Sequence, residues 1–380
     1  MVQPYPKVQA SELDVDLSDT VATPAFALLG ALDTHLSFDP NLPGKHHGHI
    51  ILPMDESGPG PQHLRIPVCL IRGKHSGQYV TMLSGIHGDE IEGPLTLQGM
   101  AQQLDADDIQ GCLVLLPSIN LPGLQAGTRG SPLDSRDLDR CFPGNATGSI
   151  SDRVAFEIFE RFIRPADLVV DLRSGGSALR FALSAAVRFA GNQPEPAHRL
   201  ADYGHSKALA QSQARQQASE AAMIAFGAPN SVRFPFSAPN SCLQAAAEAA
   251  SVAYLQTELG GGGGTSTDTL AAAQTGCYNL LRHTQLLQGD IELRATRMLE
   301  VPDASFYLHA TRRGMLQPHA RLGQELHRGD PLLSMINLED SGAIPHVMRV
   351  PRNGVLLALR DQGATEPGDL LAIIADEVQR

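Results

Sequence analysis

The sequence has few basic residues, with 29 Lys and Arg against 41 Asp and Glu and a formal net charge of −12 at pH 7. Nucleic acids and anionic membrane surfaces bind clustered Lys and Arg, so this shortage argues against both as partners. No apolar run approaches the roughly 20 residues that a membrane helix requires. The first residues, Met1 to Lys7, also lack the apolar core of a signal peptide.

Cysteine is scarce and shows no pattern. The five residues have no CxxC spacing: Cys69, Cys112, Cys141, Cys242 and Cys277. An odd, scattered set of this kind is typical of reduced thiols in a cytoplasm. We therefore predict a cytoplasmic protein without a membrane or nucleic-acid partner, and a homo-oligomer, as is common for small cytoplasmic enzymes.

What is present indicates a large globular protein. Hydrophobic residues make up 42% and charged residues 18% of the 380 residues, which is ordinary for a folded chain and long enough for more than one domain. Short apolar runs alternate with segments of helical spacing, and the runs are 48–53, 64–72, 79–86, 112–119, 167–172 and 253–257. This alternation predicts an α/β domain over residues 1–300, with a mixed, mostly parallel sheet and helices on both faces.

The composition changes near residue 300, where helical spacing gives way to short strands with Gly turns. Residues 322–333 and 365–371 form a weak repeat, each placing Gly-Asp just before an apolar strand. The pattern resembles the small β-sandwich of lipoyl and biotinyl domains. Those domains carry a modified lysine at a hairpin tip, but residues 334–340 contain none. We therefore predict a C-terminal β-sandwich domain over residues 301–380 that is structural or forms a lid.

Polar residues follow four of the apolar runs. His87 and Glu90 follow the first of these four runs, Asn120 the second, Arg173 the third and Glu258 the fourth. In open sheets covered by helices, ligands bind outside the carboxyl ends of the strands. These strand ends are therefore the predicted site.

His87 and Glu90 are three residues apart at a predicted strand-to-helix turn. An imidazole and a carboxylate at this spacing can converge on one metal ion. The alternative is an ordinary helix start, where the helix dipole favours an acidic residue. Spacing alone leaves both interpretations open.

Longer motifs narrow the choice. Four segments resemble motifs of the succinylglutamate desuccinylase and aspartoacylase family: its first zinc motif (84–94), D-x-x-D-L-N-R-x-F-P-G (134–144), D-L-H-S-G-G (171–176) and T-E-x-G-G (257–261). Lys45-His-His-Gly and Ile66-Pro67 look like the branch that deacetylates N-acetyl-diaminobutyrate. The resemblance extends from about residue 40 to the end and implies a zinc carboxypeptidase-like fold.

The resemblance also implies roles for individual residues. His87 and Glu90 would hold zinc, which activates a bound water and polarises an amide carbonyl. Glu258 would be the general base that passes the water's proton to the leaving amine. Arg140 would bind a substrate carboxylate, and Arg129, a looser match, would polarise the scissile carbonyl.

Two positions depart from the family's motifs. Arg173 stands where the family has its third zinc-ligand histidine, and a guanidinium offers only donors, so it cannot bind zinc. Asp139 stands where the family usually has asparagine, and it adds a negative charge beside Arg140. A catalytic zinc normally has three protein ligands, so zinc is expected from the resemblance but stands in doubt.

Three outcomes follow from the arginine. Arg173 could pair with Glu90 and Glu258 in place of a metal. Another group, such as Asp171, His205 or a residue of another chain, could supply the third ligand. The site could also run different chemistry, with Arg173 holding an anion and Glu258 acting as acid and base.

The predicted function is that of an amidohydrolase-type deacylase acting on a small N-acyl amino acid or a similar amide. Asn120, Arg140 and Arg173 are its predicted substrate-binding residues, and Glu258 and Arg129 its catalytic residues. The alternative is a metal-free, altered or inactive relative that binds a small carboxylate. The sequence identifies neither the acyl group nor the amine.

Overall fold

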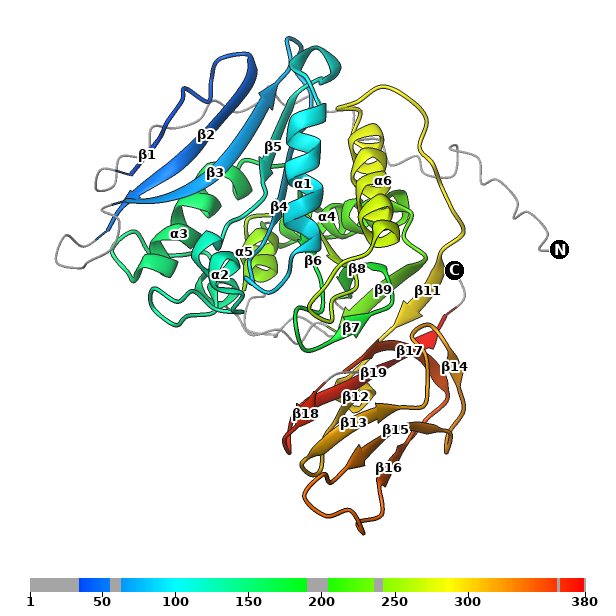
Figure 1. Ribbon diagram of the computed structural model, residues 1–380. Coiled ribbons are helices and arrows are strands. Elements are labelled where there is room, and N and C mark those ends of the chain that lie inside the picture. The colour runs from blue at the N-terminus through cyan, green and yellow to red at the C-terminus, as the bar shows by residue number, and fades with distance from the viewer. Residues whose placement is uncertain (1–33, 55–62, 190–203, 236–241, 361–362, 379–380) are drawn as a thin grey trace.

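The computed structural model describes residues 34–54, 63–189, 204–235, 242–360 and 363–378 (Figure 1). Strands up to residue 300 are β1 (His35–Leu36), β2 (Gly44–Pro53), β3 (His63–Arg72), β4 (Tyr79–Ser84), β5 (Cys112–Leu116), β6 (Leu168–Arg173), β7 (Arg180–Phe181), β8 (Ser184–Phe189), β9 (Asn230–Pro235), β10 (Ala253–Glu258) and β11 (Arg297–Glu300). Most of them join one large sheet in the order β1-β2-β3-β5-β4-β6-β10-β8-β9-β11.

The sheet is mixed, as predicted, and its parallel pairing falls in two groups of strands. Strands β5, β4, β6 and β10 are parallel neighbours, and so are β8, β9 and β11. Strands β1, β2, β3 and β5 pair antiparallel, and β10 pairs antiparallel with β8. The expectation of a mostly parallel sheet therefore holds within these two groups, while antiparallel pairing adds β1, β2 and β3 at one edge and joins β10 to β8.

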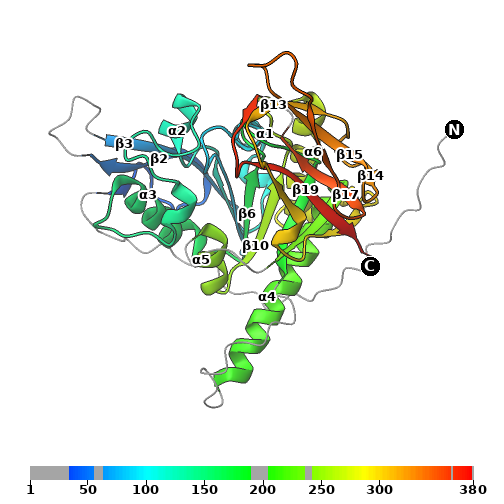
Figure 2. The same ribbon diagram turned by 90° about the horizontal axis from the view of Figure 1, so that it is seen from below.

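Helices cover both faces of the sheet, as Figures 1 and 2 show. They are α1 (Glu92–Gln103), α2 (Leu121–Ala126), α3 (Ile150–Ile158), α4 (Gly204–Phe226), α5 (Leu243–Ala249) and α6 (Thr267–His283). Short 3-10 or π turns are η2 (Ala106–Asp108), η3 (Leu138–Cys141), η4 (Phe159–Ile163) and η6 (Ala304–Phe306). In the described part, no helix is both long and apolar enough to cross a membrane.

Two separate apolar clusters hold these layers together. One packs α1, α4 and α6 on a sheet face, through residues such as Leu97, Phe226 and Leu280. The other packs α3 and α5 on the opposite face, through residues such as Ile158 and Leu243. Strands β4 and β5 are buried along their whole length because they lie between both layers. This burial explains the unbroken apolar sequence of β5, while β4 also buries Thr81 and Ser84.

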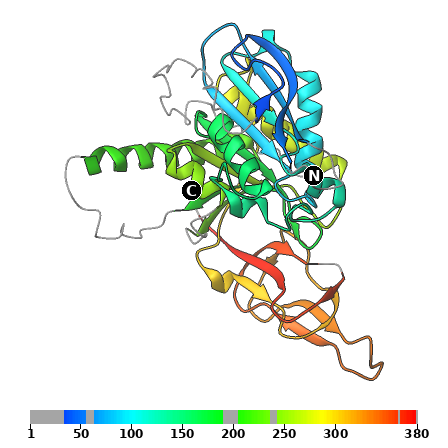
Figure 3. The same ribbon diagram turned by 90° about the vertical axis from the view of Figure 1, so that its left-hand side faces the viewer.

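The C-terminal strands are β12 (Tyr307–His309), β13 (Gly314–Pro318), β14 (Glu325–Leu326), β15 (Pro331–Ile336), β16 (His346–Arg349), β17 (Gly354–Leu359), β18 (Ala364–Thr365) and β19 (Leu370–Glu377). Strands β16-β15-β13-β18 form a four-stranded sheet, while β12 and β17 flank β19 and β14 pairs with β17. Residues of both groups share an apolar cluster, and Figure 3 shows these strands below the larger sheet.

The last strand joins the two parts of the chain, because β19 pairs antiparallel with β11. Strand β7 likewise pairs with β17, so a loop that follows β6 contacts the C-terminal strands. The predicted boundary at residue 300 falls at the end of β11. The division into two domains and the lipoyl-like sandwich remain predictions.

Candidate active site

The candidate site lies where four neighbouring parallel strands end. Strands β5, β4, β6 and β10 are adjacent and run in one direction, so their carboxyl ends share an edge of the sheet. Glu258 lies opposite Arg173 in the β6–β10 register, and Gln256 lies opposite Asp171. Register partners point to the same face, so these four side chains project to one side of the sheet.

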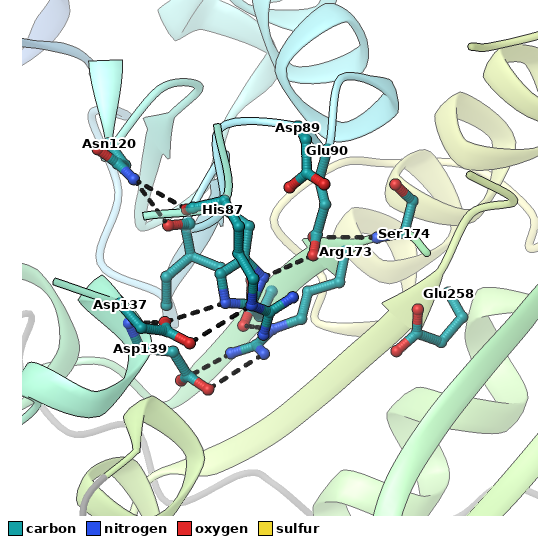
Figure 4. A network of polar contacts seen from close by, with 12 residues as sticks. His87, Asp89, Glu90, Asn120, Asp137, Asp139, Arg173, Ser174 and Glu258 are labelled. Atoms are coloured by element: carbon teal, nitrogen blue, oxygen red, sulfur yellow. Dashed lines mark hydrogen bonds and ion pairs between the residues drawn. The ribbon is translucent and has the colours of Figure 1, made fainter. Parts of the chain in front are cut away.

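His87 is buried between two carboxylates (Figure 4). Its Nδ1–H donates to Oε1 of Glu90 at 2.6 Å, and its Nε2–H donates to Oδ1 of Asp137 at 3.1 Å. Burial lowers the pKa of His87, but the hydrogen bonds to Asp137 and Glu90 outweigh it and raise this pKa to about 9. The second oxygen of Glu90 accepts the backbone N–H of Ser174 at 3.1 Å. The imidazole is therefore held as a doubly donating cation.

Arg173 at the end of β6 is clamped by two other carboxylates. Its Nε–H donates to Oδ2 of Asp171 at 2.6 Å, and Nη2 and Nη1 donate to the two oxygens of Asp139 at 2.8 and 3.3 Å. The expectation that Arg173 pairs with Glu90 and Glu258 is therefore wrong. Arg173 pairs with Asp139 because this carboxylate accepts from both Nη groups at once, in the bidentate geometry that suits a planar guanidinium.

The two carboxylates that hold Arg173 are anchored differently. Burial raises the pKa of Asp139, but the Arg173 charge outweighs this and keeps it well below the usual range. Asp139 also accepts the backbone N–H of Leu243, at the start of α5, at 3.1 Å. Asp171 is fully buried, and it accepts the hydroxyl of Tyr254 at 2.6 Å. We refer to this set as the ion-pair cluster: His87, Glu90, Asp137, Asp139, Asp171 and Arg173.

Glu258 at the end of β10 stands to one side of this cluster (Figure 4). Its Oε1 accepts the side-chain amide of Gln256 at 2.8 Å. Its Oε2 is buried and has no hydrogen-bond partner among the described residues. Burial and the negative charge of Glu90 raise the pKa of Glu258 to about 8. A buried carboxyl with a free oxygen and a pKa near neutrality is suited to proton transfer.

The glycine run that follows Glu258 forms a tight loop beside the site. Gly261 has φ 108°, and a Cβ there would come within 2.7 Å of Gly175. The N–H of Gly261 donates to the carboxylate of Glu92 at 2.8 Å, which ties the loop to the first turn of α1. Only glycine fits this left-handed backbone against a second glycine.

Asn120 lies buried at the N-cap of α2. Its side-chain oxygen accepts the N–H of Gly123 at 3.1 Å. Its amide donates to the carbonyls of Ile86 and Arg129 at 3.3 and 3.4 Å. Both ends of the side chain are thus engaged in holding the loops that precede His87 and contain Arg129, and a contact with substrate remains a prediction.

The two arginines predicted beside the substrate lie on the surface of the site. Nε of Arg129 lies 3.5 Å from Oδ2 of Asp137, and its side chain is 58% exposed. Arg140, in η3, is exposed, and within the described residues its side chain does not pair with a member of the ion-pair cluster. Arg129 therefore reaches the ion-pair cluster through Asp137, whereas Arg140 does not join it.

The donor set does not fit a catalytic zinc. Both ring nitrogens of His87 donate to carboxylates, and the position expected for a third ligand carries the Arg173 cation. The Arg173 charge is close enough to act against the protonation of His87, and it would oppose a bound dication in the same way. Within the described residues, no three His, Cys, Asp or Glu side chains form a group that could hold a metal ion.

The alternative ligands do not complete the set. Asp171 accepts from both Arg173 and Tyr254 with Oδ2, while its Oδ1 is buried and has no hydrogen-bond partner among the described residues. The Arg173 cation lies against this carboxylate and would oppose a dication there. The side chain of His205 lies outside the described residues. A ligand from another chain remains a prediction.

Three residues of the site were not predicted from the sequence. Asp137 orients His87, Tyr254 holds Asp171, and Gln256 holds Glu258. Tyr254 and Gln256 share the period-two face of β10 with Glu258, so alternation along that run is the signal that points to them. Asp137 lies inside the quoted D-x-x-D-L motif, yet its contact with His87 spans 50 positions and has no local signal.

Comparisons with known proteins identify the class. Residues 76–284 match the family model described as the succinylglutamate desuccinylase/aspartoacylase catalytic domain. The chain therefore belongs to the succinylglutamate desuccinylase/aspartoacylase family, and the resemblance predicted from its motifs is confirmed.

One sequence relative and two solved structures are similar to this chain over most of its length. The N-alpha-acetyl-L-2,4-diaminobutyric acid deacetylase of Halomonas elongata is 33% identical over 341 residues, covering 88% of this chain and 93% of the relative. A succinylglutamate desuccinylase from Silicibacter sp. TM1040 has a TM-score of 0.82 at 30% identity, covering 92% of this chain and all of that one. The product-bound ectoine utilization protein EutE from Ruegeria pomeroyi has a TM-score of 0.79 at 30% identity, covering 90% and 98%.

Proposed function

We propose that this chain hydrolyses the amide bond of a small N-acyl amino acid, releasing a carboxylate and a free amine. The observation that carries the proposal is Glu258, a buried carboxyl with one unpartnered oxygen at the shared strand edge. Support also comes from relatives of near full-length similarity that are named as a diaminobutyric acid deacetylase and a succinylglutamate desuccinylase.

Glu258 is the group that moves the proton in this proposal. Its carboxylate takes a proton from water while the water oxygen bonds to the acyl carbon. The C–N bond then breaks, and Glu258 delivers the proton to the departing amine nitrogen. Because the pKa of Glu258 is about 8, the basic carboxylate form increases as the pH rises through that value.

The arginines bind and orient the substrate in this proposal. Arg129 is exposed beside Asp137 and would polarise the acyl oxygen, while Arg140 would bind a carboxylate of the substrate. Arg173 uses three of its five N–H groups on carboxylates, so two remain for an oxygen of the ligand. Zinc is expected from the family, but no step is assigned to it because the donor set does not fit.

The clamped arginine favours a second candidate function. A site that has replaced a metal ligand by a fixed cation could bind a small carboxylate without turnover. The bidentate contact of Arg173 with Asp139 is the specific observation in favour of this candidate.

One set of assays separates the two. Purified protein is mixed with N-acetyl-2,4-diaminobutyrate or N-succinylglutamate, and the freed amine is measured beside the binding heat. Turnover that falls roughly 10²- to 10⁴-fold in Glu258→Gln supports the deacylase. Binding without turnover supports the second candidate. Turnover that is unchanged in Glu258→Gln contradicts the role assigned to this residue.

Cellular location and assembly complete the proposal. A cytoplasmic location agrees with the cysteines, since Cys69, Cys112, Cys141 and Cys277 are free and buried. A homo-oligomer is proposed because small cytoplasmic enzymes often form symmetric oligomers. Light scattering of the purified chain would measure the number of subunits. The C-terminal strands, proposed as a separate β-sandwich domain, would then be tested for a role in assembly by deleting them.

A further inference from the structure

We propose that this chain has exchanged metal binding for a built-in cation. Arg173, clamped by Asp139 and Asp171, occupies the place of the third metal ligand, and it keeps zinc from binding tightly at His87 and Glu90. The changes at positions 139 and 173 are one coupled exchange, not two independent departures from the family's motifs.

The first step is that Arg173 cannot leave its position at low cost. Its side chain is only 11% exposed, and the side chains of Asp139 and Asp171 that it pairs with are 9% and 0% exposed. If the guanidinium swung away, both carboxylates would lose their cation in a setting that water hardly reaches. Breaking a buried pair in this way is strongly unfavourable, so the cation is a permanent part of the site.

The second step is that residue 139 must be an acid for this arrangement. Both oxygens of Asp139 accept from Arg173, and one of them also accepts the backbone N–H of Leu243. An asparagine, which the family's motif usually has here, offers one acceptor oxygen and no charge. It would leave the guanidinium with half of this contact, so the aspartate and the arginine require each other.

The third step concerns the residues that would still bind a metal. Both ring nitrogens of His87 already lie within hydrogen-bond distance of a carboxylate, Glu90 at 2.6 Å and Asp137 at 3.1 Å. Glu90 accepts from His87 with one oxygen and from the N–H of Ser174 with the other. The polar groups of these two residues therefore have partners without a metal.

The test compares zinc binding in four proteins: the unaltered chain, Arg173→His, Asp139→Asn and the double variant. Each is stripped with chelator, exposed to zinc, dialysed and analysed by mass spectrometry. We expect the unaltered chain and Asp139→Asn to hold far less than one zinc per chain. Arg173→His and the double variant should each approach one, since a histidine completes a set of three ligands.

A second measurement tests the coupling through thermal unfolding in metal-free buffer. Arg173→His and Asp139→Asn should each lower Tm by roughly 5 °C or more, because each leaves buried charge without its partner. The drop in the double variant should be smaller than the sum of the two single drops.

Three results would overturn the proposal. The first is one tightly held zinc in the unaltered chain, and the second is a folded Arg173→His that gains none. The third is a drop in Tm of the double variant that equals the sum of the two single drops. If a variant does not fold, zinc binding by the unaltered chain still decides. Metal content needs no substrate, so a failure here is distinct from a failure of the proposed deacylase activity.

Discussion

The ion-pair cluster and Glu258 lie at neighbouring strand ends, but only the charged groups of the cluster have partners of opposite charge. In the cluster, His87 and Arg173 each lie between two carboxylates. Glu258 has only the neutral amide of Gln256 and one bare oxygen. Burial disfavours the charged form in both places. Ion pairs offset that penalty for His87 and Asp139, whereas Glu258 has no paired cation and remains available for chemistry.

This comparison predicts effects of opposite sign on stability. The largest is for Arg173→Met, which keeps the apolar stem but leaves Asp139 and Asp171 without their cation. The free energy of unfolding should fall by about 3–5 kcal/mol in urea denaturation. Arg313→Met is the matched control, since Arg313 pairs with Glu366 on the surface, and its cost should be far smaller than that of Arg173→Met. Equal costs for the two variants would mean that the cluster does not stabilise the fold.

Glu258→Gln should do the reverse and stabilise the protein while turnover is lost. The pKa of Glu258 in the folded chain, about 8, lies above its unfolded value, so folding becomes less favourable as the pH rises toward 8. A neutral glutamine removes this penalty and should raise the free energy of unfolding at pH 7 by about 1–3 kcal/mol.

The pH dependence of the Glu258→Gln effect is the sharper check. The gain should vanish near pH 4, where the carboxyl of Glu258 is protonated in both states, and grow up to about pH 8. Turnover by the unaltered chain should rise with pH through about 8, as the carboxylate form appears. A glutamine variant that is less stable at every pH would contradict the contrast between Glu258 and the cluster.

A smaller effect is expected from Tyr254→Phe, which deletes one hydrogen bond to Asp171 and leaves the Arg173 contact intact. The free energy of unfolding, measured in urea, should fall by about 1–2 kcal/mol. The control is Tyr278→Phe, whose hydroxyl donates to Gln103 in an exposed setting and should cost under about 0.5 kcal/mol.

The smallest effect on stability is predicted for Arg129→Met. Arg129 is mostly exposed and its contact with Asp137 is long, so the free energy of unfolding should change by less than about 0.5 kcal/mol. If Arg129 polarises the acyl oxygen, the turnover rate should nevertheless fall by at least about tenfold. Turnover that survives this change would assign Arg129 to the surface and not to the reaction.

Much of the architecture could be predicted from local sequence patterns. The apolar runs became β4, β5, β6 and β10, and the polar residues after them gather at one sheet edge. The extent of parallel pairing was overestimated, because pairing direction at an edge depends on which strands meet and not on their composition.

The hydrogen-bond and ion-pair partners inside the site were harder to predict from the sequence. The contacts of Arg173 with Asp139 and of His87 with Asp137 join residues 34 and 50 positions apart. Charge alone allowed Glu90 and Glu258 as partners of Arg173 equally well. Only the direction in which each side chain leaves its strand or turn selects between these acids.

The sequence by itself determined the family, the strand ends that build the site and the fact that an arginine stands where a metal ligand is expected. These follow from residue identity and short-range spacing, which the linear chain contains in full. The tertiary structure alone decided that Asp139 and Asp171 hold this arginine and that Glu258 keeps a free oxygen. Ion pairing and desolvation depend on distances between distant segments, and folding is what sets those distances.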